Sequence, residues 1–425
     1  MRGWLMTYSE IVIAEIQNGN LEEVEINLQL ALENDDDETL YLLGNTLYQL
    51  GFLNETERVY NHLLDLHPND DELKIYLAEI EIEDGNELEA LELLHSIDQT
   101  SPSYTQALLV EADYYHLNEL PEVSIQKLKE AEEMMPNEPV IQFALAEVYF
   151  TIADYQSAIQ YYEALVAEEH EEIAGTLLSV RLGNAYLMIG EYDEALSYLN
   201  EALTYKDDPE VYYQLGLIYV QQEEYIKAIE PLNKAKALDP SLSAIYLLLA
   251  EVYEQQNQLE KGLEEIEEGI NYNEINIDFY FKAAELAAKL NDFEKAEIYY
   301  EQALEIEPDN DRAILKFAVF LNYMDDYEKA IDLFAHIDES IRQLPESLWV
   351  LAVAHNNIEE YDEARTLFDQ AAVYLEDNLE FLKDYAFFLR EDGQREEMRA
   401  VVQKYLNLNP EFDEEMASLL DDFDY

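Results

Sequence analysis

Apolar residues recur at spacings of three and four along most of the chain, which is the period of an α-helix and not the period of two of a strand. In residues 182–202 this spacing predicts two short amphipathic helices joined by a turn that opens at Gly190. Gly183 and Tyr186 share the inner face of the first helix, and Ala195 and Leu199 share that of the second. Gly183 and Ala195 are small enough for two helix backbones to approach closely.

The small residue of this first helix recurs at a nearly constant interval. Eight of the ten intervals are 34 residues, and the two exceptions, 37 and 33, are adjacent. A second column, twelve residues downstream, holds a small residue in every copy except the last, and prolines mark the ends of many copies. The first column, called the ruler column below, consists of Gly44, Ala78, Ala112, Ala146, Gly183, Gly216, Ala250, Ala284, Ala318, Ala352 and Ala386.

The unit resembles the tetratricopeptide repeat, a helix–turn–helix of about 34 residues with an L-G-x-x-Y core and small residues in its second helix. The resemblance implies an all-α fold, a right-handed superhelical α-solenoid of about twelve units whose neighbours stack into one continuous core. We expect about five N-terminal units over residues 1–172, the first of them degenerate, and about seven C-terminal units over 173–412. An acidic capping helix or tail is expected over residues 413–425.

The 37-residue interval between Ala146 and Gly183 is the sizeable break in the period. Insertions in repeat proteins fall in loops, so a longer helix or loop that only adjusts the superhelical pitch is the plainer interpretation. The alternative is a hinge within residues 147–182 that divides the N-terminal from the C-terminal units.

The formal net charge is −71, from 24 basic and 95 acidic residues. Such a field repels nucleic acid phosphates and anionic membrane surfaces and attracts basic partners. Residues 1–170 contain 5 basic and 37 acidic residues, whereas residues 277–425 contain 13 and 37. We therefore expect a protein or peptide partner with basic residues and no nucleic acid. The alternative is that most of the acid is solvated surface.

The residue inventory offers no basis for catalysis. Cysteine is absent, none of the seven histidines forms a metal-ligand motif, and no glycine-rich phosphate loop is present. We expect no enzyme activity, no cofactor and no metal. No charge-free apolar stretch reaches about 18 residues, so we expect a cytoplasmic protein without membrane insertion, with either Met1 or Met6 as the natural start. The sequence leaves the oligomeric state open.

In the family that the chain resembles, first helices line a concave groove that takes peptides. The resemblance implies a non-catalytic scaffold or adaptor, similar to the free-standing acidic repeat proteins of low-GC Gram-positive bacteria. The alternative is a regulator whose superhelix closes on a small signalling peptide. Groove positions lie three residues before, one after and four after the ruler column, which gives the candidates Tyr41, Asn45, Tyr48, Glu79, Asp113, Phe143, Glu147, Phe150, Asn184, Tyr213, Glu251, Phe281, Asn322, Trp349 and Asn356.

A carboxylate clamp of the kind that holds chaperone tails is a further interpretation of the same groove. Arg312 and Lys316 match the spacing of the clamp's basic pair. Leu247, Glu251 and Lys282 depart from the pattern at the other clamp positions, and a glutamate there would repel a carboxylate. The sequence therefore favours a basic peptide over an acidic tail.

Overall fold

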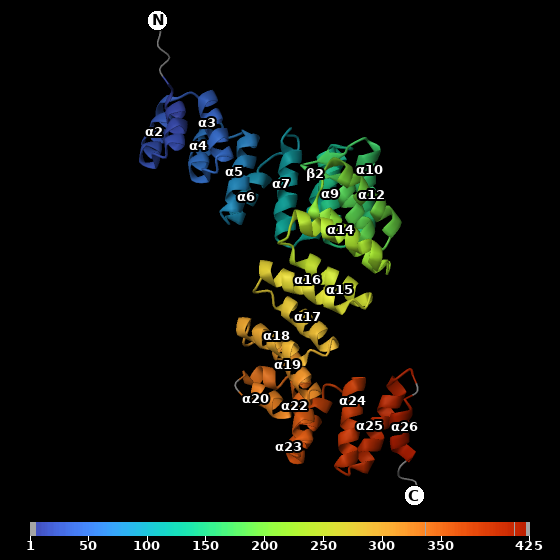
Figure 1. The fold of residues 1–425 in the computed structure, drawn as a ribbon. Coiled ribbons are helices and arrows are strands. Elements are labelled where there is room, and N and C mark those ends of the chain that lie inside the picture. Colours follow the sequence, from blue (N-terminus) through green and yellow to red (C-terminus); the bar gives the residue numbers. More distant parts are fainter. Residues whose placement is uncertain (1–5, 336, 412, 422–425) are drawn as a thin grey trace. The chain divides into compact units, whose positions relative to one another are not determined.

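The computed structural model describes residues 6–335, 337–411 and 413–421. Within these ranges the chain is an all-α solenoid of twelve helix pairs, as the sequence predicted, with one two-stranded hairpin. Consecutive pairs follow one another in chain order (Figure 1). The chain divides into two compact units, Met1–Asp207 and Asp208–Tyr425, which are described separately. The division expected after residue 172 stays a prediction.

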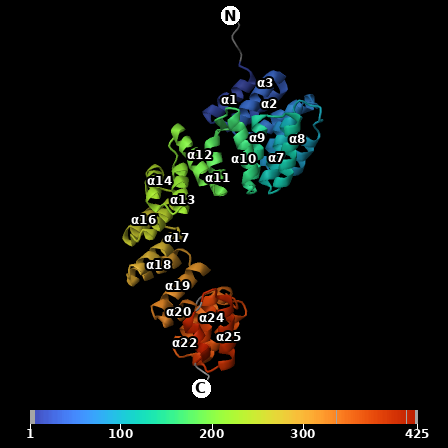
Figure 2. The ribbon, with the colours of Figure 1, turned by 90° about the vertical axis from the view of Figure 1, so that its right-hand side faces the viewer.

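The first unit holds six helix pairs, and α7 to α10 of this unit lie side by side in Figure 2. Its elements are α1 (Tyr8–Asn18), α2 (Leu21–Asn34), α3 (Asp37–Gln49), α4 (Leu53–Leu66), α5 (Asp71–Glu83), α6 (Glu87–His95), α7 (Tyr104–Leu117), α8 (Pro121–Met134), α9 (Pro139–Thr151), α10 (Tyr155–Ala167), β1 (Glu172–Ile173), β2 (Thr176–Leu177), α11 (Leu178–Met188) and α12 (Tyr192–Tyr205).

The second unit holds six further pairs, one short extra helix and a final helix. Its elements are α13 (Pro209–Gln221), α14 (Tyr225–Leu238), α15 (Ser243–Gln255), α16 (Leu259–Tyr272), α17 (Ile277–Lys289), α18 (Phe293–Ile306), α19 (Asp311–Tyr323), α20 (Tyr327–Leu333), α21 (Glu339–Arg342), α22 (Pro345–Asn357), α23 (Tyr361–Ala372), α24 (Leu379–Glu391), α25 (Arg395–Leu408) and α26 (Glu414–Asp421).

The ruler column forms the tight contact between the two helices of each pair. A Cβ atom built on Gly183 would lie 2.6 Å from Cγ of Leu199 on the second helix, and Gly216 stands equally close to Leu232. Ala195 and Ala228, from the second small-residue column, are fully buried. Close packing of this kind fixes which residues can occupy these columns.

The turn inside every pair from α3 onward contains a residue with left-handed backbone, always seven residues after the ruler column. Glycine, which adopts a positive φ without a steric penalty, occupies four of these turns. The other seven carry non-glycine residues. The full column is Gly51, Gly85, Glu119, Ala153, Gly190, Glu223, Asn257, Asn291, Asp325, Glu359 and Gly393.

The break in the period is a β-hairpin. β1 and β2 pair antiparallel, with Ile173 opposite Thr176, and the two residues between them, Ala174 and Gly175, both have positive φ. This is the backbone of a type I′ turn, which suits the twist of a two-residue hairpin. Ile173 is buried in the same hydrophobic cluster as Leu178, so the hairpin is anchored to the solenoid.

The helix α26 covers the C-terminal end of the second unit, and the capping role expected for residues 413–425 stays a prediction. Met416 and Leu419 of α26 are buried against α24 and α25, while the acidic residues 422–425 lie outside the described residues. The short helix α21 was not foreseen. It follows the early end of α20, and both changes fall within an interval of normal length, which is why the ruler column gave no sign of them.

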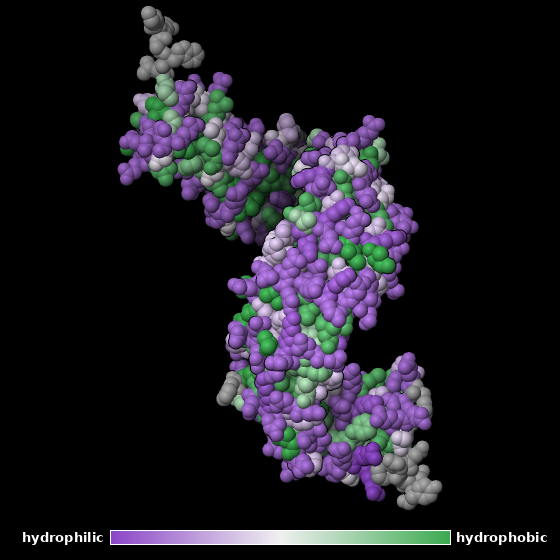
Figure 3. Space-filling model, viewed as in Figure 1, coloured by the Kyte–Doolittle hydropathy of each residue, from purple (hydrophilic) through white to green (hydrophobic). Residues whose placement is uncertain are grey.

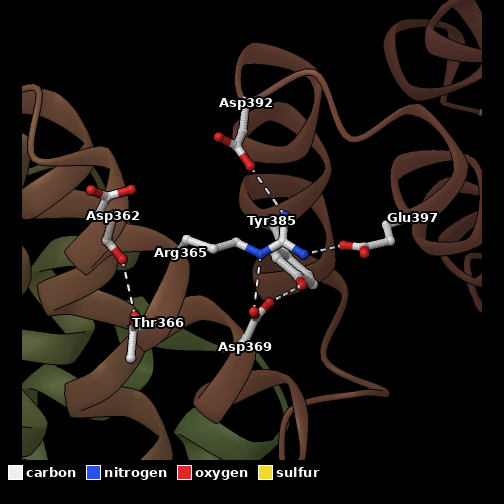
Figure 4. A network of polar contacts seen from close by, with 7 residues as sticks. All are labelled: Asp362, Arg365, Thr366, Asp369, Tyr385, Asp392 and Glu397. Carbon is white, nitrogen blue, oxygen red and sulfur yellow. Dashed lines mark hydrogen bonds and ion pairs between the residues drawn. The ribbon is translucent and has the colours of Figure 1, made fainter.

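Polar contacts also join successive pairs, as around Arg365 of α23 (Figure 4). Its Nε donates to Asp369 at 2.9 Å, Nη1 to Asp392 at 3.1 Å and Nη2 to Glu397. The Tyr385 hydroxyl donates to the second oxygen of Asp369 at 2.6 Å. One guanidinium therefore links α23 to both helices of the next pair.

Candidate binding face

All fifteen predicted groove residues lie on the first helix of a pair, as the resemblance implied. In the first unit they are Tyr41, Asn45 and Tyr48 on α3, Glu79 on α5, Asp113 on α7, Phe143, Glu147 and Phe150 on α9, and Asn184 on α11. In the second unit they are Tyr213 on α13, Glu251 on α15, Phe281 on α17, Asn322 on α19, and Trp349 and Asn356 on α22.

In the first unit, the position that follows the ruler residue forms a polar row along α3, α5, α7, α9 and α11. Asn45 accepts a hydrogen bond from the Tyr60 hydroxyl at 2.7 Å. Asp113 is exposed and has no ion-pair partner among the described residues. The Oδ1 atom of Asn184 is buried without a hydrogen-bond partner in the described part of the chain. Of these three side chains, Asp113 is thus the acceptor that is open to a partner, since Asn45 is already bonded and the Asn184 oxygen is buried.

Glu79 in this row is half-buried and has no cationic partner in the part of the chain that the structure describes. The one hydrogen bond its carboxylate accepts from those residues is a long one, 3.4 Å, from the Tyr48 hydroxyl of the preceding first helix. Burial raises the pKa of Glu79, and the charges of Glu83 and Asp113 add to the rise, while the Tyr48 hydrogen bond opposes it. A positive charge placed beside Glu79 would remove this penalty.

Glu147 is the exception in the row, because the fold supplies its cation. Arg181 of α11 approaches Glu147 at 2.7 Å, and the Tyr162 hydroxyl donates to the other carboxylate oxygen. Arg181 was not among the residues predicted from the sequence, although it lies two residues before Gly183 in a region with few basic residues. Glu147 is therefore less available to a partner than Glu79 or Asp113.

The aromatic residues of this face are half-buried and held in place by neighbours. Phe143 packs against Tyr162 with ring centres 6.1 Å apart, and Phe150 makes an edge contact with Tyr155 at 5.2 Å. The Tyr41 hydroxyl donates to the carboxylate of Asp70. We call Tyr41, Asn45, Tyr48, Glu79, Asp113, Phe143, Glu147, Phe150 and Asn184 the N-terminal face.

The corresponding columns of the second unit have a different character. Glu251 is exposed, and burial together with the charges of Glu210 and Glu251 raises the pKa of Tyr213. Phe281 is only 5% exposed, and Arg312 and Lys316 lie over its ring at 5.0 and 5.7 Å. Phe281 consequently offers little surface to a partner.

Further along this unit, Trp349 donates from Nε1 to Asp384 at 2.9 Å and stands edge-on to Phe381. Asn322 donates to the Val350 carbonyl at 2.9 Å. The Oδ1 atoms of Asn322 and Asn356 are buried without a hydrogen-bond partner in the described ranges. Trp349 and Asn322 are thus committed to contacts with the neighbouring pair.

Lysines pair with two carboxylates on first helices of the second unit, Glu254 of α15 and Glu285 of α17. Glu254 receives hydrogen bonds from Lys282 and Lys289, and Lys289 also contacts Glu285 at 2.7 Å. Burial alone would raise the pKa of Glu254, but the two lysine hydrogen bonds outweigh it and leave the pKa below its ordinary value. Here the fold itself provides the counter-charge.

The surface in Figure 3 is predominantly hydrophilic, with apolar residues scattered among polar ones. Among the described residues, no three His, Asp or Glu side chains gather in a way that could hold a metal ion. No helix in the described ranges has the combination of length and apolar character needed to cross a bilayer.

Comparisons with known proteins match this architecture. Residues 117–170 match the family described as YpiA-like, tetratricopeptide repeats, and residues 345–411 match YpiA-like, C-terminal tetratricopeptide repeats. Residues 277–310 match the tetratricopeptide repeat itself. The chain is a tetratricopeptide repeat protein. Residues 188–269 of this repeat protein also match a family described as anaphase-promoting complex, cyclosome, subunit 3.

The repeat protein is 34% identical over 241 residues to the TPR repeat-containing protein YpiA of Bacillus subtilis, and the match covers 57% of each chain. It is 36% identical over 81 residues to the mitochondrial import receptor subunit TOM70 of Saccharomyces cerevisiae, covering 19% of this chain and 13% of the receptor. The matched regions thus span little more than half of one relative and a small part of the other.

Among solved structures, yeast Tom70 aligns over 97% of this chain and 93% of its own, with 16% identity and a TM-score of 0.42. The Cut9–Hcn1 hetero-tetramer of the anaphase-promoting complex aligns over 97% and 95%, with 10% identity and a TM-score of 0.40. The family matches to repeats support a protein–protein interaction scaffold, and scaffold families of this kind are generally non-catalytic.

Proposed function

We propose that the repeat protein is a scaffold or adaptor whose N-terminal face binds a peptide or protein segment with basic and apolar side chains. The observation that carries the proposal is that no cation among the described residues pairs with Glu79 or Asp113, whereas Glu254 of the second unit is held by two lysines. A lysine or arginine from a partner would supply the missing charge.

The face also offers apolar anchors beside these acids. Aromatic side chains contribute most of the binding energy at many interfaces, and surrounding charges add steering and register. Phe150 and Tyr48 are half-buried and held by neighbours, so little side-chain freedom is lost when a partner covers them. The face therefore combines charge and anchors in fixed positions.

The names of the similar proteins support a protein as the partner. The yeast relative is named an import receptor subunit, and one family match is to a subunit of a multiprotein complex. Transferred to this chain as part of the proposal, these names favour binding of protein over binding of a small metabolite. They do not identify the partner.

Fluorescence anisotropy with a labelled peptide that alternates arginine and phenylalanine tests the proposal on the full chain. We expect Glu79→Lys combined with Asp113→Lys to weaken binding about a hundredfold, since like charges facing each other across an interface cost several kcal/mol. The matched control, Glu22→Lys with Glu23→Lys, makes the same charge change on the second helix α2 of the same unit, where both side chains are exposed.

Equal weakening by both double variants would show that only the overall charge matters and would refute the assignment to the N-terminal face. A peptide with glutamine in place of arginine should bind at least tenfold more weakly than the arginine peptide. Equal affinity for the two peptides would remove the charge argument.

A further inference from the structure

Beside the break in the repeat period lies a partly open cavity of about 430 Å³ in the first unit. The segment between α10 and β1 contributes Glu169, His170 and Glu171. Val166 of α10, Leu178 and Ser179 of α11, and Tyr198, Glu201 and Tyr205 of α12 complete the wall. The cavity shares no residue with the N-terminal face.

The hairpin fixes this cavity in shape. Ile173 is buried in the cluster that also holds Leu178 and Leu165, and the backbone N–H of Leu178 donates to the Glu171 carbonyl at 3.0 Å. The backbone N–H of His170 donates to the Leu165 carbonyl at 3.1 Å. The segment that carries the three lining residues is therefore tied to α10 and α11 at both of its ends.

The lining has the chemistry of a site for an organic cation. Three carboxylates, Glu169, Glu171 and Glu201, face the cavity, and neither lysine nor arginine lines it. Tyr198 and Tyr205 add aromatic rings, which attract cations through their negative faces. The Tyr198 ring is fixed by stacking on Tyr186, with ring centres 5.7 Å apart and planes 8° apart.

Ser179 supplies an independent sign that a ligand belongs here. It is only 7% exposed, it lines the cavity, and its hydroxyl has no hydrogen-bond partner among the described residues. This hydroxyl is not one of the polar atoms that are buried without a partner, so it opens onto the cavity and is available to a ligand. Serine can accept a hydrogen bond from a ligand N–H, which suits an ammonium donor.

The same residues do not suit a metal ion. His170 and the three glutamates line one cavity, yet no group of three His, Asp or Glu in the described ranges is arranged to hold a metal. The apolar side chains of Val166 and Leu178 would instead contact the carbon chain that carries a charged nitrogen. This combination favours an amine with an alkyl chain.

We propose that this cavity binds a primary alkylammonium group, with carboxylates and Tyr rings around the charge and Ser179 accepting one of its hydrogen bonds. The group has two sources, a free diamine or polyamine and the side chain of a lysine in another protein. The site is lined by α10, α12, the segment before β1 and the first two residues of α11, and it shares no residue with the N-terminal face proposed above to bind a peptide.

Isothermal titration calorimetry of the full chain at physiological salt tests this with three probes. Cadaverine represents the free amine, a blocked tripeptide with a central lysine represents the side chain, and 1,5-pentanediol is the uncharged control. We expect at least one ammonium probe to bind with one site per chain, and the diol to show no binding. Saturation by cadaverine alone assigns the free amine, and saturation by the lysine peptide assigns the side chain.

Variants separate the cavity from the general acidic field. Glu171→Gln with Glu201→Gln should weaken binding of the ammonium probe at least about tenfold, because each carboxylate lost removes a charge-assisted contact. Both side chains are exposed, and circular dichroism will confirm that the double variant stays folded. The matched control, Glu22→Gln with Glu23→Gln, removes the same charge from α2.

Equal weakening in the two double variants, many sites per chain, or no binding of either ammonium probe would each overturn the proposal. Tyr205→Leu keeps the bulk of a 48% exposed side chain while removing its ring and hydroxyl. It should weaken the ammonium probe several-fold, in line with the modest energy of a partly exposed cation–π contact. An unchanged affinity in this variant would contradict the arrangement of the site.

Discussion

The two compact units are built from the same repeat and carry similar net charge, yet they balance it differently. Met1–Asp207 contains 7 basic and 44 acidic residues, and Asp208–Tyr425 contains 17 and 51. In the second unit lysines pair with Glu254 and Glu285 on first helices, whereas in the first unit Glu79 has only a tyrosine hydroxyl and Asp113 has no ion pair among the described residues. The same fold thus supplies a counter-charge to these two carboxylates of the second unit and none, within the described ranges, to Glu79 and Asp113 of the first.

If the two units pack in the same way, a larger residue in the ruler column should destabilise both. Substitutions of the ruler glycines test this and should have the largest effect of the variants proposed. Gly183→Val and Gly216→Val each push a branched side chain into a leucine of the second helix. We expect each to lower the free energy of local unfolding by about 2–3 kcal/mol, the usual range for overpacking. Hydrogen exchange read by mass spectrometry will report the loss in the helix pair that carries the change.

Alanine at the same positions serves as the control, because alanine occupies the ruler column in most other repeats. Its Cβ alone already meets a leucine of the second helix, so alanine should destabilise, but less than valine. A large effect of valine in one unit and none in the other would show that the two units do not pack alike.

Arginine networks offer a second contrast between the units. In the second unit, Arg365→Met removes the cation that pairs with Asp369, Asp392 and Glu397. We expect the free energy of unfolding to fall by about 1–2 kcal/mol. In the first unit, Arg58 makes one exposed ion pair with Glu25, and Arg58→Met should change stability by less than about 0.5 kcal/mol. Urea unfolding followed by hydrogen exchange in each unit will compare them.

Lowering the pH should change the contributions of Glu79, in the first unit, and Glu254, in the second, to the free energy of folding in opposite directions. The pKa of Glu79 is raised in the folded protein, so its ionised form opposes folding at neutral pH, and protonation relieves this as pH falls toward the ordinary value of 4.5. The pKa of Glu254 is lowered, so its stabilisation is present above pH 4.5 and is lost as pH falls below that value.

The measurement is the difference in unfolding free energy between wild type and Glu79→Gln or Glu254→Gln, since the difference cancels the general effect of titrating so many acids. The Glu79 difference should shrink between pH 7 and 4.5. The Glu254 difference should be largest near neutrality and shrink below pH 4.5. Parallel behaviour of the two variants would contradict the contrast between the faces.

The repeat architecture was readable from the sequence because packing restricts a few columns severely. Gly183, Ala195 and their equivalents must be small wherever two backbones touch, so their spacing alone predicted the helix pairs. The hairpin escaped prediction because strands of two residues leave no periodic pattern. The three extra residues marked its place without indicating its structure.

The binding face was predictable only as a set of positions. The ruler column placed all fifteen candidates on first helices, but which of them remain available depends on neighbours from other helices. Arg181 pairs with Glu147 from about one repeat away, and Arg312 covers Phe281. Such contacts depend on side-chain length and direction, which a spacing rule does not contain.

The turns supply the smallest predicted effect and a last contrast between the units. Glycine holds the left-handed turn position at Gly51, Gly85 and Gly190 in the first unit, whereas the second unit has it only at Gly393 and carries Glu223 with φ 59° and Glu359 with φ 67° at others. A left-handed backbone is unfavourable for a residue with a Cβ by about 1 kcal/mol. Glu223→Gly and Glu359→Gly should therefore stabilise their helix pairs by up to about 1 kcal/mol, reduced by the greater freedom of glycine in the unfolded chain.

Gly51→Ala is the reciprocal change in the first unit and should destabilise its pair by about 1 kcal/mol, because φ is 78° and a Cβ there meets strain although no atom lies within 4 Å. Thermal unfolding, with hydrogen exchange to locate the change, will measure all three variants. Stabilisation by Gly51→Ala, or loss of stability in both glutamate variants, would mean that the left-handed turns are not a source of strain. Turn geometry would then not explain why the first unit has more glycines at these positions. It would also not explain a difference in stability between the two units.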